Sequence, residues 1–386
     1  MYNKILKLLF CASFIAMIYL PLICINTKDN VLSETENRKL AAKPKFKSEN
    51  GTFNKNFLAD LETWINDNIG FREIMVSQNA KIQFYVFDNL INNSDMYLGP
   101  NQELNYATQE MITDYQHLNL KSEDKLDEIA ESYQFFSDYL KNRGIQYYYF
   151  QCWDKHSIYP EYFPSTINQK GTISKTDQIV NTLTNNTSIN VISPKAELVD
   201  AKSKYDTYSI WGDPSHWTQR GAYIGYLQLM HCINENNAYK YKILQENDYE
   251  IYATDQGREF LGDIHKKDFI DNFTIRNPQA YLSEEEPLYL SEWQNHSRKI
   301  YYNENANNTD TLLIIGDSYF DGYLYDDFAE SFYKVVFIWG GYLEHIDELI
   351  EVYKPTIVIT ENAERCDRTE NMISTVNKLR EESSPH

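Results

Sequence analysis

Cysteine is scarce in this chain, which has five cysteines among its 386 residues. Two of them, Cys11 and Cys24, fall in an apolar segment near the N-terminus. The other three, Cys152, Cys232 and Cys366, show neither a Cys-x-x-Cys pair nor any other metal-ligand spacing. The sequence therefore predicts no zinc site and no disulfide framework, and we expect neither a metal nor a cofactor.

Positive charge is also in short supply. The chain has 36 lysines and arginines against 56 aspartates and glutamates, a net charge of −20. A phosphate backbone needs a basic footprint, so this balance argues against nucleic acid as a partner. No internal repeat or low-complexity block is present, and the hydrophobic content of 42% is ordinary for a chain that builds a core.

A long uncharged run occurs at the N-terminus. Lys4 and Lys7 precede Leu8–Ile25, which is just long enough to span a membrane. Because the positive residues lie before the run, we expect the N-terminus to stay cytoplasmic and the rest to be exported. A cleaved signal peptide is the alternative, but a small-x-small cleavage site is missing around Cys24. We expect an uncleaved, single-pass anchor in the cell membrane.

These features divide the chain into segments. Residues 1–25 are the cytoplasmic tip and signal anchor, and the polar, lysine-rich residues 26–50 are a linker. Residues 51–386 form the extracytoplasmic domain. Within it, residues 237–300 have weak periodicity and many acids, which favours an insertion or a cap.

Short apolar runs alternate with amphipathic segments through the large domain. Strands are expected at residues 145–151, 189–192, 311–315, 335–339 and 356–360, and helices at 56–87, 123–142, 173–185 and 344–353. Strands that alternate with helices indicate a parallel sheet covered on both faces. The predicted fold class is α/β, a three-layer sandwich with a central parallel sheet.

One strand ends in a candidate nucleophile. The buried run Thr311–Ile315 is followed by Gly316, Asp317 and Ser318. Ligands of open α/β sheets bind at the carboxyl ends of strands, and a serine held there by a tight turn is a common nucleophile. The alternative is that Gly-Asp-Ser serves only turn geometry and helix capping.

A second polar motif lies in the loop Gly212-Asp-Pro-Ser-His-Trp217. A loop of this length can let Asp213 accept a hydrogen bond from His216, which fixes the tautomer that a general base for serine needs. The alternative is a structural histidine packed against Trp217. Ser318 and this loop would supply different parts of one catalytic mechanism, the nucleophile and its general base.

Further stretches accompany these two motifs in a fixed order: Leu32-Ser-Glu-Thr-Glu-Asn-Arg-Lys-Leu40, Asp67-Asn-Ile-Gly-Phe-Arg72, Asp154-Lys155 with Ile158-Tyr-Pro-Glu161, Gly262-Asp263-Ile264 and Glu361-Asn-Ala-Glu-Arg365. With them the chain resembles the SGNH-type hydrolase superfamily, in the branch of alginate O-acetyltransferases and related DHHW-motif proteins. The resemblance spans about residues 31 to 368.

The resemblance implies a catalytic triad in the chain order Asp213, His216, Ser318, the circularly permuted order of this branch. The alginate enzymes carry Asp-x-His-Trp, whereas this chain carries Asp-Pro-Ser-His-Trp, which matches the general SGNH spacing. The chain is more similar to the members that lack a carbohydrate-binding module.

The activity implied is O-acetyl transfer to an extracytoplasmic polysaccharide through an acetyl-serine intermediate on Ser318. A separate multi-pass membrane O-acyltransferase is implied as the acetyl supplier. Two alternatives stay open: an acetyl-esterase that uses water as acceptor, and a non-catalytic polysaccharide-binding scaffold that kept the fold.

Weaker expectations concern substrate contacts. The candidates are Trp217, Tyr319, Lys155, Tyr159 and Arg365. Trp217 and Tyr319 flank the triad and are candidate platforms for a sugar, with simple packing as the alternative. Lys155 and Tyr159 are candidates only through their place in a loop. Arg365 follows the last strand, where lining the crevice and forming a structural ion pair are both open.

Overall fold

The computed structural model describes residues 2–28, 31–33, 38–47, 51–91, 95–285 and 298–382. Parts of three predicted features fall outside these ranges: the linker 26–50, the Leu32–Leu40 motif and the segment 237–300. The chain divides into two compact units. The smaller comprises residues 1–93 with 258–266, and the larger comprises residues 94–257 with 267–386.

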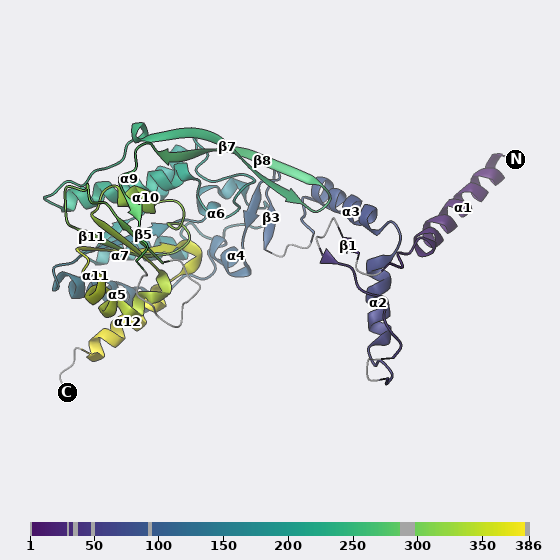
Figure 1. Ribbon diagram of the computed structural model, residues 1–386, viewed down its shortest axis with the longest axis horizontal. Helices are drawn as coiled ribbons and strands as arrows, with labels where there is room; N and C mark the ends of the chain where they lie inside the picture. Colours follow the sequence, from purple (N-terminus) through teal and green to yellow (C-terminus); the bar gives the residue numbers. More distant parts are fainter. Residues whose placement is uncertain are drawn as a thin grey trace. The chain divides into compact units, whose positions relative to one another are not determined.

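A seven-stranded sheet forms the centre of the larger unit (Figure 1). Its order is β6 (Asn190–Ile192), β5 (Gln146–Cys152), β13 (Ile357–Ala363), β11 (Thr311–Gly316), β12 (Lys334–Trp339), β10 (Arg298–Tyr302) and β9 (Tyr281–Leu282). The first five strands run parallel. At one edge, β10 pairs antiparallel with β12, and β9 pairs antiparallel with β10. All five predicted strands are present in the parallel part, so the predicted α/β class is confirmed.

Helices cover both faces of this sheet. One face packs against α8 (Lys195–Ala201), α9 (Gln219–Asn236) and α10 (Tyr325–Ala329). The other packs against α5 (Glu123–Lys141), α7 (Lys175–Asn186), α11 (Ile346–Tyr353) and α12 (Thr369–Glu382). Figure 1 shows α9 and α10 on one side of β5 and β11, with α5, α11 and α12 on the other. The three-layer sandwich is confirmed.

The position of β11 inside the sheet explains why its sequence is a continuous apolar run. Its side chains alternate between the two faces, as they must in a strand. Leu312 and Ile314 join the core under α9, whereas Leu313 and Ile315 join the core under α5. Because both faces are covered by helices, every residue of the strand is buried.

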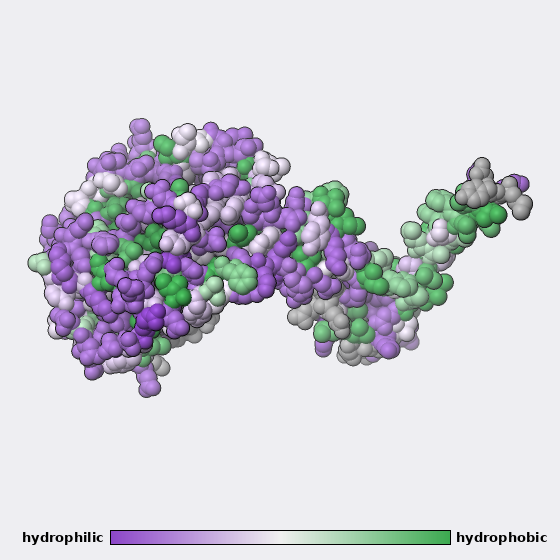
Figure 2. All heavy atoms as spheres, turned by 90° about the horizontal axis from the view of Figure 1, so that it is seen from above, coloured by the Kyte–Doolittle hydropathy of each residue, from purple (hydrophilic) through white to green (hydrophobic). Residues whose placement is uncertain are grey.

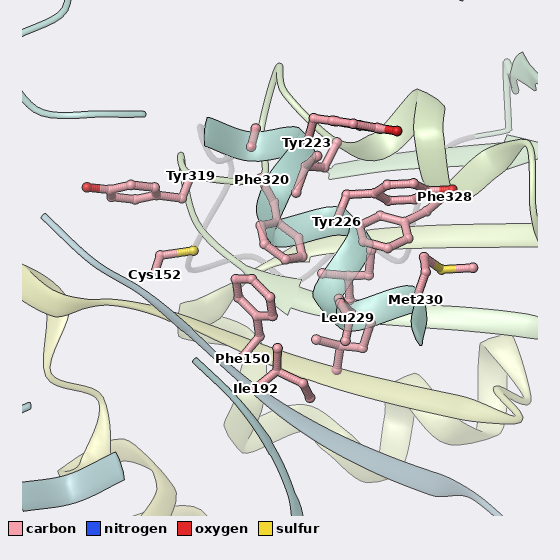
Figure 3. Close-up of a cluster of buried hydrophobic side chains, with 14 of the residues drawn as sticks. Phe150, Cys152, Ile192, Tyr223, Tyr226, Leu229, Met230, Tyr319, Phe320 and Phe328 are labelled. Atoms are coloured by element: carbon pink, nitrogen blue, oxygen red, sulfur yellow. The ribbon is translucent and has the colours of Figure 1, made fainter. Parts of the chain in front are cut away.

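The core under α9 is rich in aromatic side chains. Figure 3 shows Phe150 from β5 pointing toward Leu229 and Tyr226 from α9, with Phe320 and Phe328 from the segment after β11 beside them. The rings of Phe150 and Phe320 lie 5.2 Å apart in an edge-on arrangement, which suits the charge distribution of aromatic rings. This packing fixes the segment after Ser318 against the sheet.

The larger unit has further short elements: β3 (Met96–Leu98), β4 (Leu104–Tyr106), α4 (Gln109–Tyr115) and α6 (Lys155–Ile158). A long hairpin, β7 (Tyr249–Phe260) and β8 (Ile264–Ile275), occupies much of the predicted insertion 237–300. The tip of the hairpin belongs to the smaller unit. Gly262 turns it with φ of +93°, and a Cβ there would lie 2.9 Å from the carbonyl oxygen of Ser77, so only glycine fits.

The smaller unit contains α1 (Tyr2–Ile23), β1 (Leu32–Ser33), β2 (Arg38–Lys39), α2 (Phe57–Asn68) and α3 (Arg72–Phe87). Residues 4–23 of α1 are long and apolar enough to cross a membrane, which is consistent with a single-pass anchor or a signal sequence. Figure 2 shows apolar residues along this helix.

The predicted helix 56–87 is two helices. Between them, the backbone N–H of Gly70 donates to the carbonyl of Pro21 at 2.9 Å, so the corner packs against the end of α1. The motif residue Asp67 binds Arg38 through two hydrogen bonds of 2.7 and 2.8 Å. These bonds outweigh burial and lower the pKa of Asp67 to about 2. Asp67 of the Asp-x-x-x-x-Arg motif therefore serves the structure of the smaller unit.

The buried sheet yields a stability prediction. We expect Leu313→Ala to lower the free energy of unfolding by about 2–5 kcal/mol, because it removes a fully buried side chain between two helical layers. Val352→Ala is the matched control, since Val352 is half exposed on α11 and should change stability by less than about 0.5 kcal/mol. Urea denaturation followed by tyrosine and tryptophan fluorescence measures both. Equal losses in the two variants would contradict the assigned core.

Candidate active site

The carboxyl end of β11 holds Ser318 in a tight, braced turn. Gly316 allows Glu361 to approach the backbone, because a Cβ on Gly316 would lie only 2.8 Å from Glu361 Oε2. That oxygen accepts the backbone N–H of Asp317 at 2.6 Å. The Gly-Asp-Ser sequence is therefore required by the neighbouring strand as well as by the turn.

Asp317 itself is buried and braces the turn from inside. Its carboxylate accepts the backbone N–H of Tyr319 at 3.1 Å and that of Ala363 at 3.2 Å. Arg368 adds an ion pair at 3.2 Å. These bonds tie the residues on either side of Ser318 to β13, so the serine hydroxyl is presented by a fixed backbone.

The loop after Gly212 brings His216 to Ser318. His216 Nε2 lies 2.8 Å from Ser318 Oγ, and Nδ1 lies 2.9 Å from Asp213 Oδ2. The other oxygen of Asp213 accepts the backbone N–H groups of Ser215 at 2.8 Å and His216 at 3.0 Å. The structure thus brings all three predicted catalytic residues together.

The electrostatics of Asp213 follow from these contacts. Burial opposes its ionisation, but the hydrogen bonds from His216 and Ser215 outweigh burial and hold the pKa of Asp213 below its ordinary range. The carboxylate is therefore charged at neutral pH and can stabilise a proton gained by the imidazole.

Arg365 fixes the tautomer of the imidazole. Its Nη2 lies 2.9 Å from His216 Nε2, the nitrogen that Ser318 also contacts. A guanidinium only donates, so Nε2 accepts and the ring proton sits on Nδ1, facing Asp213. The guanidinium also binds Asp154 and lies 3.4 Å from the Tyr319 hydroxyl. Among the five predicted substrate contacts, Arg365 is the one whose polar group lies within hydrogen-bonding distance of a triad residue. Its side chain remains partly exposed.

Trp217 and Tyr319 are buried, with 1% and 0% of their surface exposed. Trp217 Nε1 donates to the carbonyl of Tyr319 at 2.9 Å, and the Tyr319 hydroxyl donates to Asp154 Oδ1 at 2.9 Å. Their ring faces are therefore not available to a sugar. The sequence suggested platforms for substrate, and the structure favours the packing alternative.

The expectation that Lys155 and Tyr159 contact substrate is corrected in the same way, because both side chains are buried. Lys155 Nζ donates to the carbonyls of Leu104 at 2.6 Å and Ser209 at 2.7 Å, and burial lowers the pKa of Lys155 to about 8. The Tyr159 hydroxyl accepts the backbone N–H of Thr207 at 3.2 Å. Both side chains hold the segment that leads to Asp213, so they position the loop from inside the protein.

Sequence reasoning missed the role of Asp154, although it lies in a quoted motif. Asp154, His156 and Glu364 are buried, and one donor atom from each lies within 4.8 Å of the others. A metal ion fits this group poorly, because Arg365 already binds Asp154. Burial and the Asp154 charge raise the pKa of Glu364 to about 8. A proton on Glu364 therefore balances the charge of the cluster.

The fold and this constellation define a class: an α/β protein with a mostly parallel central sheet and a serine, a histidine and an aspartate in hydrogen-bonding contact. No family model and no curated protein matches the chain.

Solved structures do match. Two structures of PatB1 from Bacillus cereus, the second with a sulfonyl adduct, have TM-scores of 0.51 and 0.53 at 15% and 16% identity. They cover 72% and 73% of this chain and 97% of their own. A DHHW family protein from Eubacterium siraeum has a TM-score of 0.49 at 14% identity and covers 74% of this chain and 96% of its own.

The O-acetyltransferase domain of AlgJ from Pseudomonas putida has a TM-score of 0.46 at 14% identity, and covers 74% of this chain and 99% of its own. The similarity to PatB1 confirms the predicted relationship at the level of the fold. At these identities it does not extend to activity.

The raised pKa of Glu364 yields a prediction on pH. Its carboxyl titrates near pH 8 in the folded protein and near 4.5 when unfolded. Its contribution to stability is therefore full below about pH 4.5 and is lost as the pH rises toward about 8. We expect Glu364→Gln to flatten the dependence of the free energy of unfolding on pH between about 5 and 8, measured by urea denaturation.

Glu131→Gln on the exposed side of α5 is the matched control and should leave the slope unchanged. A Glu364→Gln curve parallel to that of the natural protein would mean that Glu364 ionises normally in the fold.

Proposed function

We propose that this chain is an extracytoplasmic O-acetyltransferase that modifies a cell-surface or secreted polysaccharide. The observation that carries the proposal is the hydrogen bond of 2.8 Å between Ser318 Oγ and His216 Nε2, with Asp213 on the opposite ring nitrogen. An activated nucleophile needs this pair of contacts. The fold shared with PatB1 is consistent with the proposal but does not identify the reaction.

The proposed reaction has two halves. In the first, Ser318 Oγ attacks the carbonyl carbon of an acetyl ester or thioester, and its proton passes to His216 Nε2. The acyl bond to the leaving group breaks, and the leaving group takes that proton. In the second, a sugar hydroxyl attacks acetyl-Ser318, His216 accepts its proton, and Ser318 leaves and is reprotonated.

Three groups are proposed to favour these steps. Asp213 keeps the imidazole oriented and stabilises it when it is charged. Arg365 Nη2 lies 2.9 Å from the imidazole nitrogen that Ser318 contacts, and its guanidinium is one proposed donor to the acyl oxygen on which negative charge develops. The backbone N–H of Ser318, at the turn after β11, is the second proposed donor to that oxygen.

Water in place of the sugar hydroxyl would make the same site an acetyl-esterase, and both reactions share acetyl-Ser318. A transferase must therefore hold its sugar at high effective concentration to compete with water. The arrangement of the three polar residues speaks against a non-catalytic scaffold. From the family resemblance, we also propose that a separate multi-pass membrane O-acyltransferase supplies the acetyl groups.

Ser318→Ala tests the nucleophile. We expect cleavage of a generic acetyl ester to fall by at least about 10³-fold, because a triad acts as a unit. A sulfonyl fluoride should label the natural protein at Ser318 and fail to label the variant, as read by mass spectrometry of peptides. The exposed Ser203→Ala serves as the matched control and should keep both activity and labelling. Undiminished turnover in Ser318→Ala would exclude the proposed nucleophile.

The location of the enzyme is tested separately. Lys4, Lys7 and the apolar helix α1 predict that residues after about 26 lie outside the cytoplasm. Protease added to spheroplasts should therefore digest the large domain. The mass of the protein extracted from membranes distinguishes an uncleaved anchor, at 45.5 kDa, from a cleaved signal sequence. Protection of the domain from protease would show that the orientation is reversed.

A further inference from the structure

A cavity of about 550 Å³ lies in the larger unit. Small-molecule sites commonly have volumes of roughly 300–1,000 Å³, so this cavity can hold a sugar unit and its neighbour. Its wall combines aromatic rings with carboxylates, and the side chains that decide its chemistry are Phe273, Tyr301, Tyr323, Asp326, Asp327 and Glu330.

The segments that follow His216 and Ser318 both contribute residues to the wall of this cavity. Tyr323, five residues after Ser318, lines it, and the Tyr323 ring lies 6.3 Å from the imidazole of His216. Gln219, at the start of α9, also lines it and follows His216 closely in sequence. A molecule that fills the cavity would contact Tyr323, whose ring also lies near His216, and this favours the cavity as the place of the second reactant of acetyl transfer.

The aromatic side chains suit the apolar face of a sugar ring. Phe273, Tyr301 and Tyr323 are partly exposed, unlike Trp217. Aromatic rings offer a large, rigid surface at little cost in conformational entropy. These three rings can therefore take the platform role that the sequence suggested for Trp217.

The carboxylates supply acceptors for hydrogen bonds. Glu330 Oε1 accepts the backbone N–H groups of Gln279 at 2.6 Å and Ala280 at 2.9 Å. Its Oε2 is buried and has no hydrogen-bond partner in the described part of the chain; only Lys242 Nζ approaches, at 3.5 Å. Lys242 pairs with this oxygen without a hydrogen bond, so a hydroxyl or amino group entering here would add the missing hydrogen bond.

The charge of the wall restricts the ligand further. Asp326, Asp327 and Glu330 line the cavity, whereas its lysine, Lys299, is already bound to Asp321 at 2.7 Å. Glu330 is paired with Lys242, and burial raises the pKa of Asp327 to about 7, so the exposed Asp326 is the main negative charge of the wall. A carboxylate or phosphate on the ligand would be repelled inside a site of low dielectric constant.

We propose that this cavity binds the acceptor glycan, and that the unit bound there carries hydroxyl or amino groups and no acidic group. The role as acceptor site rests on the proposed function, whereas the selection against acidic sugars rests on the cavity alone. The acceptor is thus a neutral or amine-bearing polysaccharide, and not a uronic acid polymer.

Binding to the full-length protein in detergent, without an acetyl donor, tests the inference directly. The probes are oligosaccharides of equal length built from N-acetylglucosamine, from glucosamine and from galacturonic acid. We expect the first two to bind at least about tenfold more tightly than the third in isothermal titration, because like charges are juxtaposed only in the third. Equal or tighter binding of the galacturonic acid oligosaccharide would overturn the inference.

Two variants locate the binding site. Phe273→Ala should weaken binding of the glucosamine oligosaccharide by at least about fivefold, since it removes one face of the platform. Asp326→Asn should raise the relative affinity for galacturonic acid several-fold and reduce its dependence on salt. Asp326 is exposed, so this change should leave the fold intact. Asp200→Asn, exposed on α8 outside the cavity, is the matched control. Unchanged binding in both cavity variants would place the ligand elsewhere.

Acetyl transfer is then measured with an activated acetyl ester and the same three probes. Binding with the expected selectivity but release of acetate alone would overturn transfer and leave the glycan site standing. Acetylation of the galacturonic acid probe, with no preference for the other two, would leave the transferase standing and overturn the assignment of the cavity.

Discussion

The hydrogen bond from the indole N–H of Trp217 to the backbone carbonyl of Tyr319 joins two segments that are 102 residues apart in sequence. His216 and Ser318 directly precede its two ends and are separated by the same number of residues. A bond of 2.9 Å between buried partners therefore fixes the distance between base and nucleophile. Geometry at this level decides whether a proton can move within the pair.

Buried charged side chains support the contact between His216 and Ser318. Asp317, Glu361 and Arg368 brace the serine turn, and Asp154 with Arg365 braces the histidine. Such groups cost free energy to bury, and burial together with the charge of Asp317 raises the pKa of Glu361. The gain in stability from them is small. Their effect is on position, because each carboxylate accepts several fixed donors.

Much of the fold could be predicted from the sequence because the parallel strands are buried on both faces. Leu312–Ile315 and Ile357–Ile359 are continuous apolar runs, and that signal is local. The edge strands β9 and β10 were not predicted, since a two-residue strand has no period and Arg298–Tyr302 is only half buried. Pairing with β12, and not local pattern, makes β10 a strand.

The site divides in the same way. Asp213, His216 and Ser318 were predicted because residue types at loop and strand-end positions carry the signal. The burial of Trp217 and Lys155 was not predictable, because it depends on which distant segments cover them. The aromatic and acidic cavity is assembled from α9, the hairpin and the segment after β11, so no single stretch of sequence could have indicated it.

The order of strands has a consequence for biosynthesis. β5 pairs with β13, and hydrogen-bonded residues on the two strands lie as much as 211 positions apart. On the ribosome, β5 and β6 are complete long before their partner exists, and one edge of β5 carries unpaired amide and carbonyl groups during that interval. High contact order of this kind slows folding. The nascent chain therefore exposes this edge of β5 until its last strand arrives.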